Sequence, residues 1–149
     1  MIRTFAAAAL TALLVFAGTA LAQQFGTASE AKAMLDKAVA ALKANKTKAL
    51  EDFNNATGGF RDRDLYVFCA GPDGKLTSHA NPALRGTDIK TIVDKNGKKL
   101  GEEIMTVAAE GKIAEVNYMF PRPGQTEPVQ KVSYVTKVGD QVCGVGYYK

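Results

Sequence analysis

Apolar residues recur at helical spacing in the first third of the chain. Thr27-Ala28-Ser29-Glu30 has the form of a capping box, in which a threonine and the glutamate three residues later satisfy each other's backbone N–H groups. The apolar positions that follow it are Ala31, Leu35, Ala38, Val39 and Leu42. A second helical stretch covers residues 47–55, and Gly58-Gly59 ends it. The pattern therefore predicts a long N-terminal helix followed by a shorter one.

From residue 65 onward, short runs that contain aromatic and β-branched residues lie between turn signals, which is typical of strands. Gly71-Pro72-Asp73-Gly74 and Gly139-Asp140 are turn signals. The segment 84–99 is a turn-rich crossover that leads into a short helix over 100–109. The strands that this pattern predicts are 65–69, 75–80, 113–120, 129–138 and 141–148. We expect an α+β domain with a five-stranded antiparallel sheet and a long N-terminal helix.

The first 22 residues have the order of a cleavable secretory signal peptide. Arg3 gives a positive start, an uncharged apolar run covers residues 5–16, and Ala20-Leu21-Ala22 is a small-x-small cleavage site. The alternative is a membrane anchor, but the run is short for a span of about 20 residues. We expect cleavage after Ala22 and a mature domain of residues 23–149 in the periplasm, without a stable membrane anchor.

The charge of the chain is mildly positive. The formal net charge is +4, and removing Arg3 with the signal peptide leaves +3. The lysines are scattered and do not form a stripe with interleaved aromatic residues, so we expect no nucleic-acid partner. One histidine without clustered partners does not indicate a metal site, and no cofactor motif is present. This balance suits a small anionic ligand.

The mature chain keeps two cysteines, Cys69 and Cys143, each in an apolar, strand-like run. An even number of cysteines in an oxidising compartment favours a disulfide. The bond would close a loop worth on the order of 4.5 kcal/mol in the chain-entropy model. Two buried thiols or a redox pair remain alternatives, although redox pairs are usually closely spaced.

The order of elements is PAS-like, and several motifs resemble the single Cache domain family. In the first half these are Tyr66-Val67-Phe68-Cys69, Pro72-Asp73-Gly74-Lys75-Leu76, His79, Asn81-Pro82 and Leu84-Arg85-Gly86. In the second half they are Tyr118-Met119-Phe120-Pro121-Arg122-Pro123-Gly124, Lys131-Val132-Ser133-Tyr134-Val135 and Gly144-Val145-Gly146-Tyr147-Tyr148. The resemblance covers about residues 26–149.

The resemblance implies an extracytoplasmic sensor domain with a pocket on one face of the sheet. The loop and short helix between the second and third strands would roof that pocket, and the ligand would be a small organic acid. Most members are flanked by membrane spans in chemoreceptors or histidine kinases. This chain shows a signal peptide and no signalling module, so we expect a stand-alone form that passes its signal to a membrane receptor or sensor kinase.

The residues that we expect to contact the ligand combine one cation, one histidine and four aromatic rings. Lys131, in the Lys-x-Ser-Tyr pattern, is the candidate cation for a carboxylate. His79 is a candidate donor. The aromatic candidates are Tyr66, Phe68, Tyr118 and Tyr134. The alternatives are a solvated lysine, a structural histidine and plain core aromatic residues. We expect Arg122, between two prolines, to face solvent.

Two other functions compete with ligand binding. In the first, the domain is an interaction protein that docks on a membrane receptor, and a ligand is secondary or absent. In the second, it is an enzyme whose serine would have to use His79 as the base. Ser78 is adjacent in a strand and points to the opposite face, and no Gly-x-Ser-x-Gly elbow is present. We therefore do not expect an enzyme.

Overall fold

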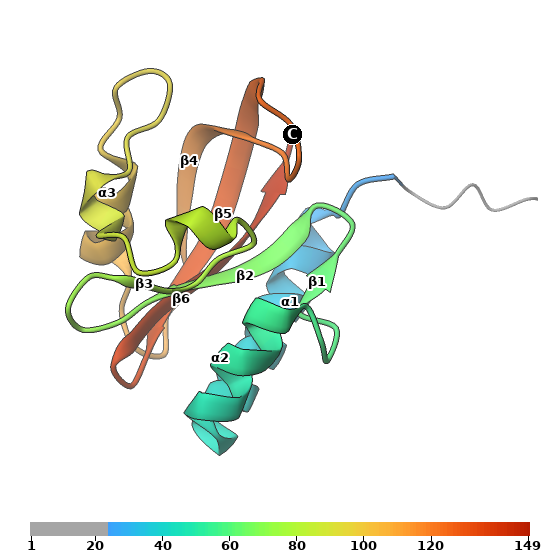
Figure 1. Cartoon of the computed structure of the whole chain (residues 1–149), viewed down its shortest axis with the longest axis vertical. Coiled ribbons are helices and arrows are strands. Elements are labelled where there is room, and N and C mark those ends of the chain that lie inside the picture. Colours follow the sequence, from blue (N-terminus) through green and yellow to red (C-terminus); the bar gives the residue numbers. More distant parts are fainter. Residues whose placement is uncertain (1–23) are drawn as a thin grey trace, which may run out of the picture.

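The computed structural model describes residues 24–149, so the predicted signal peptide lies outside the described residues. The chain starts with two helices, α1 (Ala28–Ala44) and α2 (Lys46–Asn55), which lie together on one side of the molecule (Figure 1). The predicted capping box is present at the start of α1. Thr27 Oγ1 accepts from the Glu30 N–H, and the Glu30 carboxylate accepts from the Thr27 N–H.

One antiparallel sheet follows the helices. Its strands are β1 (Arg61–Asp62), β2 (Leu65–Ala70), β3 (Leu76–Ser78), β4 (Ala114–Pro121), β5 (Pro128–Val138) and β6 (Gln141–Tyr148). The order is β1-β2-β6-β5-β4, and β3 also pairs with β2. The α+β prediction is confirmed, and the five expected strands are all present. The sixth strand, β1, has two exposed polar residues and no apolar alternation that could have predicted it.

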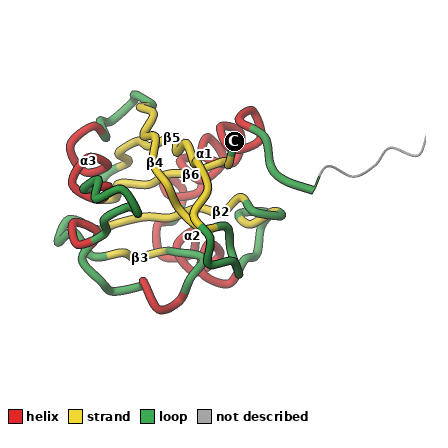
Figure 2. Tube along the Cα trace, turned by 90° about the horizontal axis from the view of Figure 1, so that it is seen from above, coloured by secondary structure: helices red, strands yellow, loops and turns green. Residues whose placement is uncertain are grey.

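Each face of the sheet packs against a different set of elements. Helices α1 and α2 cover one face, which we call the helix face, and its buried residues include Leu65, Val67 and Val145. The other face, which we call the ligand face, carries Tyr66 and Phe68, and its side of the molecule also holds α3 (Figure 2). Successive strand residues point to opposite faces, so even-numbered β2 residues reach the ligand face.

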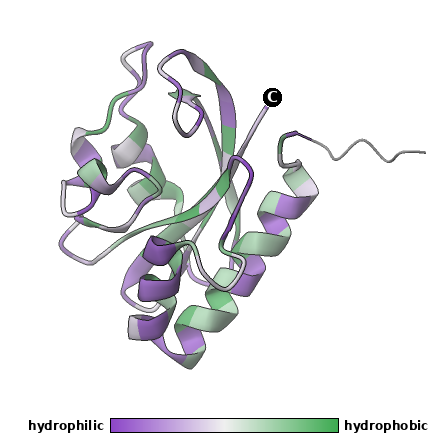
Figure 3. Cartoon of the chain, turned by 45° about the vertical axis from the view of Figure 1, so that its right-hand side comes forward, coloured by the Kyte–Doolittle hydropathy of each residue, from purple (hydrophilic) through white to green (hydrophobic). Residues whose placement is uncertain are grey.

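The ligand face is roofed by the crossover between β3 and β4. This segment forms two short 3₁₀ helices, η1 (Pro82–Leu84) and η2 (Ile89–Thr91), and then α3 (Leu100–Val107). Its apolar side chains Ile89, Leu100 and Ile104 are buried against the sheet. In Figure 3 the ribbon of α1 alternates between hydrophilic and hydrophobic colours, as expected for a helix with one buried side.

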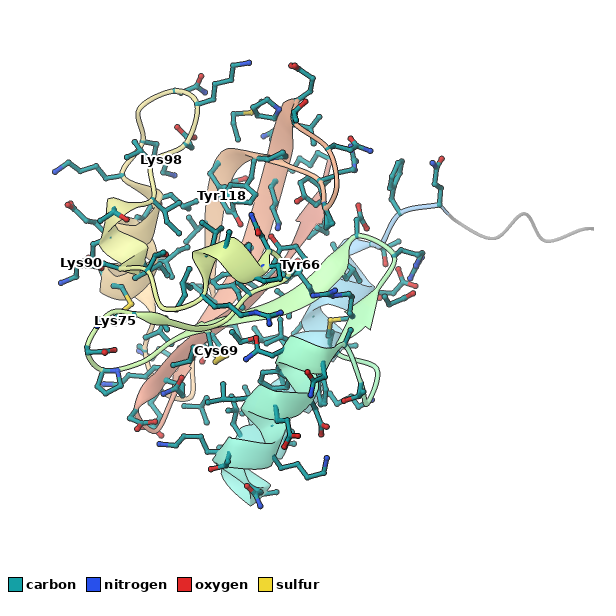
Figure 4. The ribbon with its side chains drawn as sticks, viewed as in Figure 1. Tyr66, Cys69, Lys75, Lys90, Lys98 and Tyr118 are labelled. Carbon is teal, nitrogen blue, oxygen red and sulfur yellow. A yellow bond between two sulfur atoms is a disulfide. The ribbon has the colours of Figure 1, made fainter. Side chains whose placement is uncertain are left out.

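The disulfide joins the two strands at the centre of the sheet. Cys69 in β2 lies directly opposite Cys143 in β6, with 4.1 Å between the two Cα atoms, and the sulfur atoms are bonded (Figure 4). Both residues are fully buried on the helix face. The disulfide prediction is therefore confirmed over the alternative of two thiols. Separately, none of the helices in residues 24–149 has the length and apolar character needed to cross a membrane.

Candidate ligand-binding site

The centre of the ligand face is a buried lysine. Lys131 lies in the inward-facing row of β5, is only 1% exposed, and directs its side chain across β6 to β2. There its Nζ donates a hydrogen bond of 2.9 Å to the Tyr66 hydroxyl. An ammonium group has three N–H donors, so this bond leaves two for an incoming anion. The expectation of a solvated lysine is thereby excluded.

Three aromatic rings surround this ammonium group. The Nζ of Lys131 lies 4.2 Å from the ring centroid of Tyr66, 4.7 Å from that of Tyr148 and 5.5 Å from that of Phe120. Ring faces attract a cation and exclude water from it. The rings come from β2, β6 and β4, so the sheet itself assembles the cage.

The charge of Lys131 is only weakly compensated. Within residues 24–149 no ion pair joins its Nζ to a carboxylate. Burial lowers the pKa of Lys131 from 10.5 to about 7, and the negative charge of Asp64 opposes this shift. A carboxylate in contact with Nζ would supply the missing counterion.

His79 lies beside the cage as a neutral ring. Burial, and then the positive charge of Lys131, lower its pKa to about 4. Its Nδ1 accepts a hydrogen bond of 2.9 Å from the Asn81 N–H, so the proton of the neutral ring is on Nε2. The ring packs edge-on against Tyr66 with 5.1 Å between the centroids. His79 therefore offers one N–H donor near the lysine.

Two spaces adjoin this cage at Tyr66 and Phe120, whereas Lys131 and Tyr148 line neither of them. An inner cavity of about 20 Å³, with apolar walls that include Phe68 and Ile104, lies under the η2–α3 roof. An outer cleft of about 520 Å³ extends toward Arg61 and the β4–β5 loop. Tyr66, His79 and Phe120 line both spaces. The inner cavity holds about one water molecule, so any larger ligand must move side chains or roof as it enters.

Two more predicted residues complete the wall of the inner cavity. Tyr118 and Phe68 both line it, from β4 and β2. The Tyr118 hydroxyl shares a hydrogen bond of 2.7 Å with Ser133 Oγ, and the ring is 7% exposed. Tyr66 and Tyr118 lie on the same side of the sheet (Figure 4). Five of the six predicted residues therefore gather in one place.

Tyr134 does not join them. It belongs to the helix face, where its ring packs beside Tyr147 with 5.9 Å between the centroids. Lys131 and Tyr134 are three residues apart in one strand, so their side chains must point to opposite faces. The prediction that both residues line one pocket is therefore incompatible with strand alternation, and we leave Tyr134 out of the site.

The sequence also missed Arg122, Phe120 and Tyr148. Arg122 was expected in solvent, but its side chain is 14% exposed and its Nε lies 3.3 Å from the Asp64 carboxylate. Its guanidinium stacks on Phe25 and Tyr148, 4.1 and 4.8 Å from the ring centroids. Phe120 and Tyr148 could have been predicted from strand alternation. Phe120 lies two residues from the predicted Tyr118, and Tyr148 lies an even number of residues from the inward-facing positions of β6.

The fold is therefore an antiparallel sheet with a long helix on one face and, on the other, a roofed cavity beside a buried lysine that three rings surround. The sequence matches the description "Single Cache domain 2" over residues 17–148. The chain belongs to the single Cache domain 2 family. This family is one of sensory ligand-binding domains, which agrees with the expectation of a non-enzymatic role.

Relatives with this fold come from chemotaxis proteins. The methyl-accepting chemotaxis protein McpP of Pseudomonas putida is 34% identical over 90 residues, which are 58% of this chain and only 16% of that protein. A methyl-accepting chemotaxis protein from Vibrio parahaemolyticus has a crystal structure with a TM-score of 0.67 and 25% identity, covering 80% of this chain and 86% of that one.

Two further solved structures are similar. One, described as the periplasmic sensor domain of a chemotaxis protein, has a TM-score of 0.60 and 26% identity, covering 80% of this chain and 88% of that one. The other is described as showing the structural basis for carboxylic acid recognition by a Cache chemosensory domain. It has a TM-score of 0.59 and 26% identity, covering 80% of this chain and 86% of that one.

Proposed function

We propose that this chain is a periplasmic sensor domain that binds a small organic acid through its carboxylate, with Lys131 as the cation. The observation that carries this proposal is the buried ammonium group of Lys131, which has a tyrosine hydroxyl as hydrogen-bond partner and three rings around it. A buried lysine without a counterion is costly, so its presence calls for an anion that arrives from outside.

The surroundings favour a small ligand. The inner cavity is about 20 Å³ and apolar, while Tyr66, Phe120 and the His79 Nε2–H border the cleft through which an acid would enter. A short acid can place its carboxylate between Lys131 and His79 and its carbon chain against Phe68 and Tyr118. The recognition of a carboxylic acid by a similar Cache domain supports the same class of ligand here.

A thermal-shift panel of acetate, propionate, lactate and pyruvate tests this function on the mature protein. An acid present at 100 times its Kd adds about 2.7 kcal/mol to the free energy of unfolding. In a domain of this size that raises the Tm by roughly 10 °C. We expect at least one of the four acids to produce a shift of this kind.

The variant Lys131→Met keeps the length of the side chain and removes its charge. Loss of a desolvated charge partner weakens such an interaction by about 100-fold or more, so the stabilising acid should no longer raise the Tm. Lys137→Met is the matched control, because Lys137 lies on the same strand and is exposed. If none of the four acids stabilises the wild-type protein, the proposal fails.

We further propose that residues 1–22 direct export and that the domain passes its signal to a membrane receptor or sensor kinase. The similarity to a periplasmic sensor domain and to chemotaxis proteins supports this context. In the competing function, docking on a receptor needs no ligand. A receptor that co-purifies from periplasmic extract, together with no thermal shift from any acid, would favour that competing function.

A further inference from the structure

A glycine lies directly under the side chain of Lys131. Gly146 is in β6, where it pairs with Ser133 of β5. Lys131 pairs with Tyr148, two residues further along β6. To reach Tyr66 in β2, the lysine side chain must therefore run diagonally over Gly146.

The backbone of β6 does not require a glycine at this position. Gly139, in the turn before β6, has a φ of 59°, a conformation that favours glycine. Gly146 has no such positive φ, since it is an ordinary strand residue. A glycine inside a strand weakens it and often marks a close approach of another group. The reason for Gly146 therefore lies in the space above it.

That space is filled by the lysine. A Cβ at position 146 would lie closer to Lys131 Cε and Ser133 Oγ than real Cβ atoms approach other atoms. The two atoms come from neighbouring inward-facing positions of β5, and Ser133 is itself held by its hydrogen bond to Tyr118. Any side chain at 146 would therefore have to displace the lysine stem.

We propose that Gly146 is a positioning residue of the ligand-binding site: its missing side chain leaves the groove in which Lys131 lies flat against the sheet and ends at the Tyr66 hydroxyl. The expected effect of Gly146 on binding rests on the proposed function, whereas its effect on the position of the lysine can be tested separately. A residue of this kind acts through Lys131 and does not itself contact the ligand.

Gly144 provides a matched comparison. It lies on the same strand and faces the same side, and its φ is likewise not positive. A Cβ at 144 would meet the Phe68 ring and the backbone oxygen of Tyr134, and no atom of Lys131 is among its nearest neighbours. Gly144→Ala therefore crowds the same strand and the Phe68 ring without obstructing the lysine, which makes it a control for the position of the lysine.

The experiment compares Gly146→Ala and Gly144→Ala with the wild type in two measurements. In calorimetry, Gly146→Ala should weaken the stabilising acid by about 100-fold, as expected when a charge partner is lost. In NMR, the titration midpoint of the Lys131 ¹³Cε resonance should move from about 7 toward 10.5, because the displaced amine reaches water. Gly144→Ala should leave this midpoint unchanged, even where its Tm falls.

Unchanged affinity together with an unchanged titration midpoint in Gly146→Ala would overturn the inference. If no acid binds the wild-type protein, the proposed function fails, while the NMR titration still decides the role of Gly146.

A Gly146→Ala protein that does not fold at 25 °C is tested in the Lys131→Ala background, where the lysine stem no longer occupies the groove. The double variant Lys131→Ala/Gly146→Ala should fold at 25 °C, because the lysine stem no longer obstructs the alanine. Gly144→Ala should lower the Tm by the same amount in the wild-type and Lys131→Ala backgrounds. A double variant that is as unfolded at 25 °C as Gly146→Ala would overturn the inference.

Discussion

At the scale of single residues, the site depends on a lysine that lowers the stability of the domain without ligand. Lys131 is 1% exposed, and its pKa of about 7 lies well below the ordinary 10.5. The protonated form is therefore disfavoured in the folded chain. Proteins tolerate such groups where they serve binding, and the aromatic cage explains why this one stays in place.

The free energy of unfolding should rise with pH between about 7 and 9.5. In this window the unfolded chain binds the proton that folded Lys131 has released, so raising the pH favours the folded state. Below pH 7 the buried lysine is protonated, and this lowers the free energy of unfolding by its full amount, on the order of 5 kcal/mol for a pKa shift of this size. Urea unfolding at pH 6, 8 and 9.5 measures it, below the ordinary tyrosine pKa of about 10.

Lys131→Met should be more stable than the wild type by about 2–4 kcal/mol at pH 6, with a gain that shrinks toward pH 9.5. The same variant loses the ligand, so stability and binding change in opposite directions. Lys137→Met should keep the wild-type pH profile. Parallel profiles for the wild type and Lys131→Met would show that the lysine is not the titrating group.

Single residues also show which parts of the candidate site could be located from the sequence. Lys131 and Tyr66 were predicted by chemistry, since a carboxylate needs a cation and a water-excluding wall. Tyr134 was assigned by its aromatic ring, although its distance of three residues from Lys131 in one strand excludes a shared face. A glycine such as Gly146 inside a strand indicates that another group can approach closely, but only the fold shows that this group is the Lys131 side chain.

At the scale of elements, local signals predicted nearly all boundaries. The turn at 71–74, the turn at 139–140 and the capping box are each defined by a few adjacent residues, so they can be read without the fold. The strand order cannot be predicted from such local signals, because β2 pairs with β6, which is distant in the sequence. The short strand β1 is defined by its own pairing with β2, and its sequence shows no strand pattern.

Thr27→Ala should destabilise the domain by about 1 kcal/mol, because the Glu30 N–H at the start of α1 loses its acceptor. Chemical denaturation of the mature protein measures the change. Thr47→Ala is the control, since Thr47 is exposed within the first turn of α2. An equal loss in both variants would point to helix propensity and not to the cap.

At the scale of the whole molecule, the disulfide connects the parts that define the two faces. Both cysteines lie in the helix-face core with residues of α1, and the loop that the bond closes contains β3, the roof of the ligand face, β4, β5 and the first residues of β6. The bond was predictable from the count of cysteines and the expected export. The position of the two cysteines directly opposite each other was not predictable, because the pairing of β2 with β6 was unknown.

Reduction of the Cys69–Cys143 bond should lower the free energy of unfolding by about 2–5 kcal/mol. The double variant Cys69→Ala/Cys143→Ala should show a loss in the same range without reductant, and added reductant should not change it further. Both are measured by urea unfolding at pH 7. A wild-type protein with the same midpoint in oxidising and reducing buffer would contradict this expectation.

The same cross-link determines how the domain responds to mechanical force. Tension applied between residues 24 and 149 reaches the bond through β2 and β6, and residues 70–142 inside the closed loop carry no load. Only the helices, β1 and most of β2 and β6 can be drawn out, roughly 170 Å of extended chain. The bond therefore limits extension to less than half of the described chain, and the roof and β4 cannot be pulled apart until it is reduced.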